Sequence, residues 1–255
     1  MPEENRILIP AISIDIFAAA RIGLVALAWT DYAKALLPFQ NFTLYHLIEG
    51  ILFYLISTAL LVGWCARGMA LALGALLLAF RVYNGFILGE RLFLYHHETL
   101  VIFFSILLSF SPCEKCCSLD SKRLSIKEGG ESLWFLPMFR GLLSSIYIYA
   151  AIDKLSASSL NGTRLYLTAL DYYFGSVSVP ALAELPLKSL TGMIVLIELG
   201  LGVAVWSSRG ARRAFPLAVF FHVVLYLTVP VGIFSALMIL LWMIVIYSQP
   251  SVDQR

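Results

Sequence analysis

Charge is what this sequence lacks most. Only 13% of its 255 residues are Asp, Glu, Lys or Arg, whereas 60% are hydrophobic, and the mean hydropathy is +0.86. A soluble domain needs about twice that charged fraction to cover its surface. The composition therefore excludes an ordinary soluble protein and predicts an all-α, polytopic integral membrane protein in the cell membrane.

Three further absences narrow the function. The net charge of +2 is small and no basic stripe is interleaved with aromatics, which excludes a nucleic-acid partner. The sequence has no internal repeats of fixed length and no low-complexity stretch. The first ten residues, MPEENRILIP, hold no basic region ahead of a cleavable apolar segment, so no signal peptide is expected.

Hydrophobic runs are abundant. At about 20 apolar residues per span, we find eight segments, near residues 11–29, 44–64, 68–88, 92–111, 135–153, 189–206, 214–229 and 231–247. We expect one helical bundle of about eight spans, a single transmembrane domain over residues 1–255 with no soluble lumenal domain. The last two segments are short and joined at Pro230, so one broken hairpin is the alternative.

Basic residues in the loops predict the orientation, because cytoplasmic loops carry more Lys and Arg. One side holds ten of them: Arg6, Arg67, Lys115, Lys122, Arg123, Lys127, Arg209, Arg212, Arg213 and Arg255. The other side holds four: Lys34, Arg91, Arg164 and Lys188. Both termini are therefore expected in the cytoplasm, and the 155–188 segment is expected as an outer-side loop with an amphipathic, Tyr-rich piece.

Lys154 ends the fifth span at the outer surface, and two interpretations are open. It either snorkels to the lipid headgroups or turns into a polar cavity, where burial lowers its pKa and frees an amine that takes a proton. The inward interpretation predicts that Lys154 Nζ lies about 7 Å or less from a nitrogen of His97 or His222, through one bridging group.

Other ionisable side chains share the middle and outer half of the membrane. They are His46, Glu49, Arg81, His96, His97, Glu198 and His222. Each is costly against lipid and tolerated only when partnered or wet, so together they predict a polar cavity that opens outward. Structural alternatives stay open: an interfacial His46–Glu49 pair, a buried Arg81–Glu198 ion pair, and a His222 that donates to a backbone carbonyl.

The sequence has four cysteines, and three of them lie in the loop after the fourth segment, in the run SPCEKCC (Cys113, Cys116 and Cys117). A C-x-x-C suggests zinc or redox chemistry, but no second pair or histidine follows in the loop. Zinc needs a fourth ligand, from Cys65 or a partner. Incidental thiols are the favoured interpretation, and no metal is predicted.

Four stretches resemble the horizontally transferred transmembrane domain family, which includes the membrane domain of vitamin K-dependent gamma-carboxylase. They are residues 15–23 (DIFAAARIG); His96-His97 with Ser118-Leu119-Asp120; residues 149–155 (YAAIDKL) with Gly162; and Phe221-His222 with residues 231–234 (VGIF). Their order along nearly the whole chain matches the family pattern.

The resemblance implies a chemistry. In the carboxylase, the lysine matching Lys154 is the base that deprotonates vitamin K hydroquinone, dioxygen then reacts, and the strong base that forms removes a glutamate proton. The histidine matching His97 is assigned to a later step. The implied cofactor is a reduced quinone, menaquinone or vitamin K hydroquinone, with dioxygen, and His222 is expected to polarise or position the substrate.

Departures from the family pattern open a second hypothesis. Asp153 stands where the carboxylase has a second lysine, and Ser156-Ala157-Ser158-Ser159 replaces an acidic stretch. Small bacterial relatives include a factor that matures a secreted peptide toxin, so the fold is not tied to carboxylation. The alternatives are therefore a quinol-dependent oxygenase or peptide-modifying enzyme, and a non-catalytic maturation or immunity partner. In the latter, residues 155–188 would dock a small secreted peptide.

Overall fold

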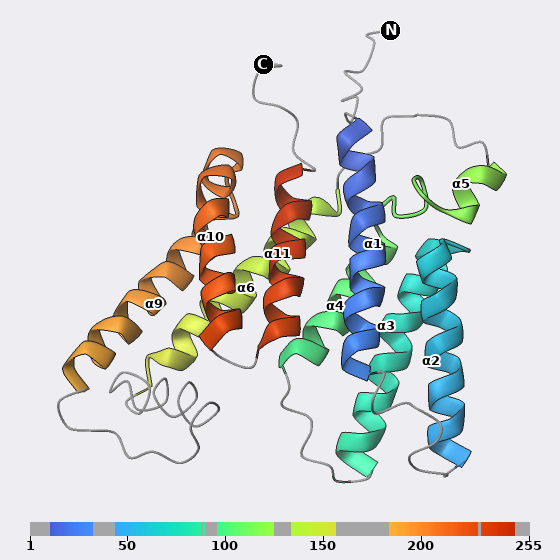
Figure 1. Ribbon diagram of the computed structural model, residues 1–255, viewed down its shortest axis with the longest axis horizontal. Helices are drawn as coiled ribbons and strands as arrows, with labels where there is room; N and C mark the ends of the chain where they lie inside the picture. Colours follow the sequence, from blue (N-terminus) through green and yellow to red (C-terminus); the bar gives the residue numbers. More distant parts are fainter. Residues whose placement is uncertain are drawn as a thin grey trace, which may run out of the picture. The chain divides into compact units, whose positions relative to one another are not determined.

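The computed structural model describes residues 11–32, 44–87, 89, 96–124, 134–156, 184–228 and 231–247. Every regular element in these ranges is a helix and no strand occurs in them, which confirms the all-α prediction. Figure 1 follows the helices from α1 in blue to α11 in red. Most of the predicted 155–188 loop, residues 157–183, lies outside the described residues, and so does Pro230.

Each of the eight hydrophobic segments carries a helix. They are α1 (Ala11–Tyr32), α2 (Leu44–Val62), α3 (Ala66–Val82), α4 (His96–Ser109), α6 (Leu136–Lys154), α9 (Glu184–Ala204), α10 (Ser208–Thr228) and α11 (Gly232–Tyr247). The π-helical turn η1 (Tyr83–Ile87) extends α3, and the short α5 (Leu119–Leu124) follows α4. Helix α10 begins before the predicted residue 214, because its first turns carry arginines that a search for apolar runs leaves out.

Two helical stretches are long and apolar enough to cross a membrane by length and composition. They are residues Ala66–Gly85 and Ser208–Thr228, and four shorter apolar helices of 10–17 residues accompany them in the described ranges. Large apolar side chains also point outward, among them Leu55 (58% exposed), Leu196 (71%) and Phe220 (67%). Such outward apolar faces suit lipid rather than water. The count of eight spans stays a prediction.

The chain divides into two compact units. The N-terminal unit comprises residues 1–137 and 247–255, and the C-terminal unit comprises residues 138–246. In the N-terminal unit α1 packs on α2 and α4, and α3 packs on the same two helices, so the four close into a bundle. Gly74 lets α3 approach α4 closely, since a Cβ there would lie 2.7 Å from Ile106 Cγ1.

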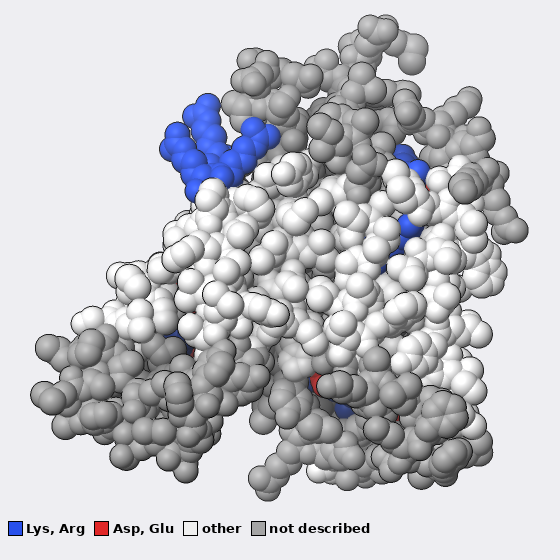
Figure 2. All heavy atoms as spheres, in the orientation of Figure 1, with Lys and Arg blue, Asp and Glu red and all other residues white. Residues whose placement is uncertain are grey.

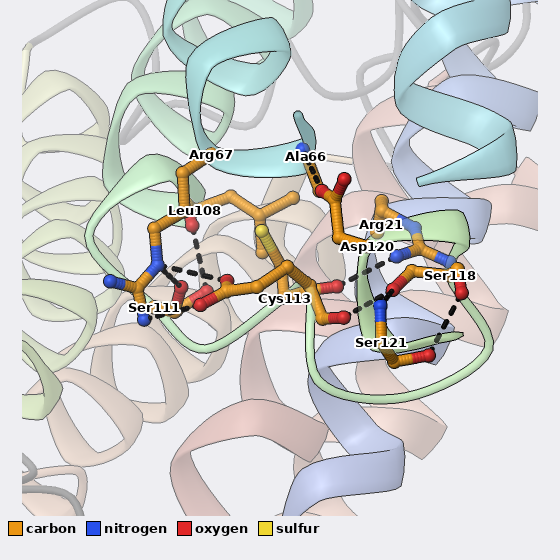
Figure 3. Close-up of polar contacts among 10 residues, drawn as sticks. Arg21, Ala66, Arg67, Leu108, Ser111, Cys113, Ser118, Asp120 and Ser121 are labelled. Atoms are coloured by element: carbon orange, nitrogen blue, oxygen red, sulfur yellow. Dashed lines mark hydrogen bonds and ion pairs between the residues drawn. The ribbon is translucent and has the colours of Figure 1, made fainter. Parts of the chain in front are cut away.

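A buried arginine ties the first helix of this unit to the loop after α4. Arg21 is fully buried, and its guanidinium donates to the carbonyl oxygens of Cys113, at 2.7 Å, and Cys117. The close-up in Figure 3 shows Arg21 pointing into this loop. A buried cation must be hydrogen-bonded to be tolerated. The loop carbonyls therefore make Arg21 a structural residue.

Asp120 ties the same loop to the start of α3. Its two carboxylate oxygens accept the backbone N–H groups of Cys65 and Ala66, at 3.0 and 2.8 Å, and so cap α3 (Figure 3). A carboxylate at a helix N-terminus pairs orphan donors and suits the helix dipole. Ser118 likewise accepts the Ser121 N–H at 2.9 Å, in the first turn of α5.

Gly63, in the turn between α2 and α3, completes this cluster, which we call the Arg21 cluster: Arg21, Gly63, Cys113, Cys117, Ser118 and Asp120. Gly63 has a φ of +72°, and its carbonyl accepts the Asp120 N–H at 3.1 Å. A Cβ at Gly63 would lie 2.7 Å from both the Ser118 Cα and the Arg21 Nη1. Only glycine fits both the left-handed backbone and the close approach.

In the C-terminal unit, α6 and α9 are joined by side-chain hydrogen bonds. Ser144 donates to the Gly202 carbonyl at 2.8 Å and accepts the indole N–H of Trp206 at 3.1 Å. Helix α11 contributes a nearly continuous buried face, with Leu237, Met238, Leu241, Trp242, Ile244 and Val245 all fully buried. The core of this unit therefore lies against α6 and α11.

Gly63→Ala should destabilise the protein by about 2–5 kcal/mol, because alanine is strained at this φ and its methyl group overlaps Ser118. Unfolding in detergent, followed by far-UV circular dichroism, would measure the loss. Gly68→Ala is the matched control: it lies in α3, nothing surrounds its Cβ position within 4 Å, and alanine favours the helix there. Equal stability of the two variants would contradict the close approach at Gly63.

Candidate functional site

One face of α6 carries the candidate site. Phe139, Leu143, Tyr147 and Ala151 on this face are buried. Lys154 continues it, three residues after Ala151 and seven after Tyr147, which are the spacings of neighbours on a helix face. Asp153 lies off this face and is exposed, as its position about 100° around the helix from Lys154 predicts.

The lysine is held by an acid of α9. Lys154 Nζ lies 2.8 Å from Glu198 Oε1 and 3.0 Å from Oε2, and it also donates to the Ala150 carbonyl oxygen at 3.2 Å. The carboxylate side chain is 5% exposed and the lysine side chain 31% exposed. A charge-assisted hydrogen bond of this kind is stronger than a neutral one. Lys154 therefore belongs to a two-residue acid–base unit with Glu198.

Two turns earlier on α6, Tyr147 connects two other helices. The indole N–H of Trp242 on α11 donates to Tyr147 Oη at 2.9 Å, and Tyr147 Oη lies 2.7 Å from His222 Nε2 on α10. All three side chains are buried. The interpretation of His222 as a donor to a backbone carbonyl is therefore wrong, because its ring nitrogen meets a tyrosine hydroxyl instead.

Lys154 of the ion pair and Tyr147 of this hydrogen-bonded row lie on the same face of α6. Seven residues separate Tyr147 from Lys154, a rise of roughly 10 Å along the helix. The predicted approach of Lys154 to His222 or His97 stays a prediction, and for His97 it would join the two units.

The alternative of a buried Arg81–Glu198 ion pair is wrong. Arg81, at the end of α3, pairs with Glu98 of α4 at 2.8 Å, within the N-terminal unit. Glu198 pairs with Lys154. The Arg81–Glu198 pair was expected from the predicted depth of both residues in the membrane. The partner of a side chain is decided by the helix that packs beside it, and α3 packs on α4.

The remaining predicted residues are placed only in part. His97 is half-buried in the first turn of α4, and Glu49 is buried in α2. The side chains of His46 and His96 lie outside the described residues. The His46–Glu49 pair and the cavity lined by these residues therefore stay predictions.

Sequence reasoning missed three residues of these clusters: Glu98, Tyr147 and Trp242. Glu98 directly follows the His96-His97 pair, at the end of the helix that faces Arg81, so the need of Arg81 for an acid was the available signal. Tyr147 stands two turns before Lys154 on a stripe of buried residues, a spacing readable from sequence. Nothing in the sequence distinguishes Trp242 from an ordinary core tryptophan.

Comparison with known proteins identifies the family. The model of the HTTM domain matches residues 5–250, nearly the whole chain. This chain belongs to the HTTM domain family. The domain is the one found in vitamin K-dependent gamma-carboxylase, which confirms the resemblance drawn from the motifs. No curated protein and no solved structure matches.

Membership makes this protein a membrane domain related to the carboxylase, and the structure gives one of the matched motifs a physical role. In Ser118-Leu119-Asp120 the serine caps the first turn of α5 and the aspartate caps α3. Leu119 between them is 45% exposed. The two polar positions of this HTTM motif are therefore structural caps in the Arg21 cluster.

The cysteines of this HTTM domain lie in or beside the same cluster. Cys113 is fully buried, whereas Cys65 and Cys117 are exposed, and all four cysteines of the chain are free thiols. Within the described ranges no group of three His, Cys, Asp or Glu side chains is arranged to hold a metal ion. Burial raises the pKa of the Cys113 thiol to about 12. Cys113 therefore contributes its backbone carbonyl to the structure and no thiolate.

Cys113 should resist maleimide in the folded, detergent-solubilised protein, because a thiol with a pKa near 12 is protonated at pH 7–9 and buried. Variants that keep a single cysteine would be labelled and weighed by intact-mass spectrometry. Cys65 and Cys117 variants should label fully, and Cys113 should label only after denaturation in SDS. Rapid labelling of native Cys113 would contradict its burial.

Proposed function

We propose that this HTTM domain is a membrane enzyme that oxidises a reduced quinone with dioxygen, with Lys154 as the proton acceptor. The Lys154–Glu198 pair, at the end of a buried helix face, is the observation that carries the proposal. Family membership supports it, because the related carboxylase is the source of the expected lysine chemistry. His97 and His222 are proposed to position the substrate.

The pair explains how a lysine in contact with an acid can act as a base. In a poorly polar site, a proton that passes from the ammonium to the carboxylate converts two charges into two neutral groups. Glu198 is the more buried partner of the pair and Lys154 the more exposed one. The released amine of Lys154, the more exposed member, then takes a proton from the substrate.

The residues present suit such a substrate. A reduced quinone supplies two electrons and two hydroxyl protons, and its ring is apolar. The pair offers both an acceptor and a donor for a hydroxyl group, and the Lys154 side chain is 31% exposed, so a substrate can reach it. The imidazole ring of His222, in the same unit, adds a nitrogen-bearing side chain.

Lys154→Ala should lower quinone product formation about 10²–10⁴-fold, the range that a general base contributes. Purified protein would receive reduced menaquinone or vitamin K hydroquinone with dioxygen, and the products would be separated by chromatography. Lys154→Arg is the sharper variant, because arginine keeps the pair with Glu198 but does not release its proton. Asp153→Ala, next to it and off the helix face, is the matched control and should retain activity.

Identical product profiles for the wild type, Lys154→Ala and Lys154→Arg would overturn the proposal. Absence of turnover in the wild type would favour the non-catalytic maturation or immunity partner of a secreted peptide. Unfolding temperatures of all variants would be measured beside the assay, so that a lost ion pair is separated from lost chemistry.

We further propose that the protein crosses the cell membrane several times with both termini in the cytoplasm. Helix α10 begins with Arg209, Arg212 and Arg213, and Figure 2 shows these basic side chains grouped over its start. Cations oppose the positive N-terminal end of a helix dipole, so helix stability does not explain them. Attraction to an anionic cytoplasmic membrane surface explains these arginines. The exposed Trp206 just before α10 suits a membrane–water interface.

Cys117 should report this orientation. In intact cells a membrane-impermeant maleimide should leave a variant with Cys117 alone unlabelled, and permeabilised cells should label it, because its loop is cytoplasmic in this orientation. A cysteine in place of Arg91, on the opposite predicted side, is the control and should label in intact cells. The reverse pattern would contradict the orientation.

A further inference from the structure

The hydrogen-bonded row Trp242–Tyr147–His222, named here the Trp–Tyr–His row, links three helices of the C-terminal unit. Its contacts are 2.9 Å from Trp242 Nε1 to Tyr147 Oη and 2.7 Å from Tyr147 Oη to His222 Nε2. The three side chains are 0, 2 and 1% exposed. The function proposed above uses His222 to position the substrate but gives no role to Tyr147 or Trp242.

The direction of the row follows from its donors. An indole nitrogen can only donate, so Tyr147 Oη accepts from Trp242. The single hydroxyl hydrogen of Tyr147 then has His222 Nε2 as its acceptor. If His222 donated instead, both the hydroxyl hydrogen and the other ring nitrogen would be buried without a partner. The first arrangement leaves one such atom, the second leaves two, and buried polar atoms are rarely unpaired.

This direction fixes the tautomer of His222. A neutral imidazole whose Nε2 accepts carries its proton on Nδ1. His222 Nδ1 is buried and has no hydrogen-bond partner in the part of the chain that the structure describes. The row therefore presents a single, oriented N–H donor that no group of the described residues accepts.

Two other buried polar atoms of the same unit, Arg140 Nε and Ser235 Oγ, also have no partner among the described residues. Ser235 stands seven residues before Trp242, on the same face of α11, and directly follows Phe234, whose ring centroid is 6.1 Å from that of His222. Unpaired buried donors of this kind are satisfied by a ligand or an ordered water.

We propose that Tyr147 and Trp242 are positioning residues, which hold His222 as the Nδ1–H tautomer so that this N–H donates to an acceptor oxygen of the bound substrate. The role in turnover rests on the function proposed above; the tautomer and its cause do not. Tyr147 also lies on the α6 face that ends in Lys154, so the residue that orients His222 and the proposed proton acceptor belong to one helix face.

Nitrogen NMR of ¹⁵N-histidine-labelled protein in lipid nanodiscs tests the tautomer directly. The chain has four histidines, and a His222→Gln variant identifies the His222 signals by their loss. We expect protonated Nδ1 and unprotonated Nε2 in the wild type. Tyr147→Phe, which removes only the hydroxyl group, should abolish this preference. Tyr149→Phe, on the same helix but 64% exposed, is the matched control and should leave it intact.

The role of the N–H is tested with oxidised menaquinone as the probe, since its carbonyl oxygens only accept hydrogen bonds. Its addition should shift the Nδ1 resonance of His222 in the wild type and in Tyr149→Phe, but not in Tyr147→Phe. In the turnover assay, Tyr147→Phe and Trp242→Phe should each lose about 10–100-fold in rate, as outer partners of a functional histidine do.

Three results would overturn the proposal. The first is a wild-type His222 protonated on Nε2, or a tautomer that Tyr147→Phe leaves unchanged. The second is an Nδ1 resonance that does not respond to menaquinone, which would assign the donor to a bound water. The third is unchanged turnover in Tyr147→Phe despite an altered tautomer. Absence of turnover in every protein, with the tautomer as expected, would instead contradict the quinol oxidation alone.

Discussion

A charged or strongly polar group on an apolar helix must find its hydrogen-bond partner inside the protein, and this constraint governs both units of the structure. Arg21 finds the carbonyl oxygens of Cys113 and Cys117. Lys154 finds Glu198, and Tyr147 finds both Trp242 and His222. Each solution joins elements that are distant in sequence, so the polar groups determine which helices and loops come together.

These polar contacts form two groups, one around Arg21 and one around Lys154 and His222. Around Arg21, two guanidinium nitrogens donate to backbone carbonyl oxygens and Asp120 caps α3, while Arg21 Nε is buried with no partner among the described residues. The side chain of Lys154 on α6 remains 31% exposed, and His222 Nδ1 on α10 is buried with no partner in the described ranges. Incomplete satisfaction is costly for folding and useful for chemistry. The acceptors around Arg21 are backbone groups, which suits a structural role, whereas the partly exposed amine of Lys154 is the group to which we assign the proposed chemistry.

The sequence allowed the helices to be predicted well, because long apolar runs are a local signal. It also placed Lys154 at the end of a helix and excluded Asp153 as its direct partner. Partners across helices could not be derived in the same way. Arg81 and Glu198 were expected at comparable depths in the membrane, but they belong to different units, and depth does not identify the neighbouring helix. Ser118 and Asp120 matched a family motif, yet their capping role required the turn at Gly63 to be seen.

The Arg21 cluster has a consequence for the order of synthesis. The acceptors of the Arg21 guanidinium lie 92 and 96 residues further along the chain. When α1 leaves the ribosome, the loop that will accept these hydrogen bonds has not been translated. Until α4 and its loop emerge, the arginine depends on other groups for its hydrogen bonds. Helix α1 therefore cannot reach its final packing before the chain has been synthesised as far as Cys117.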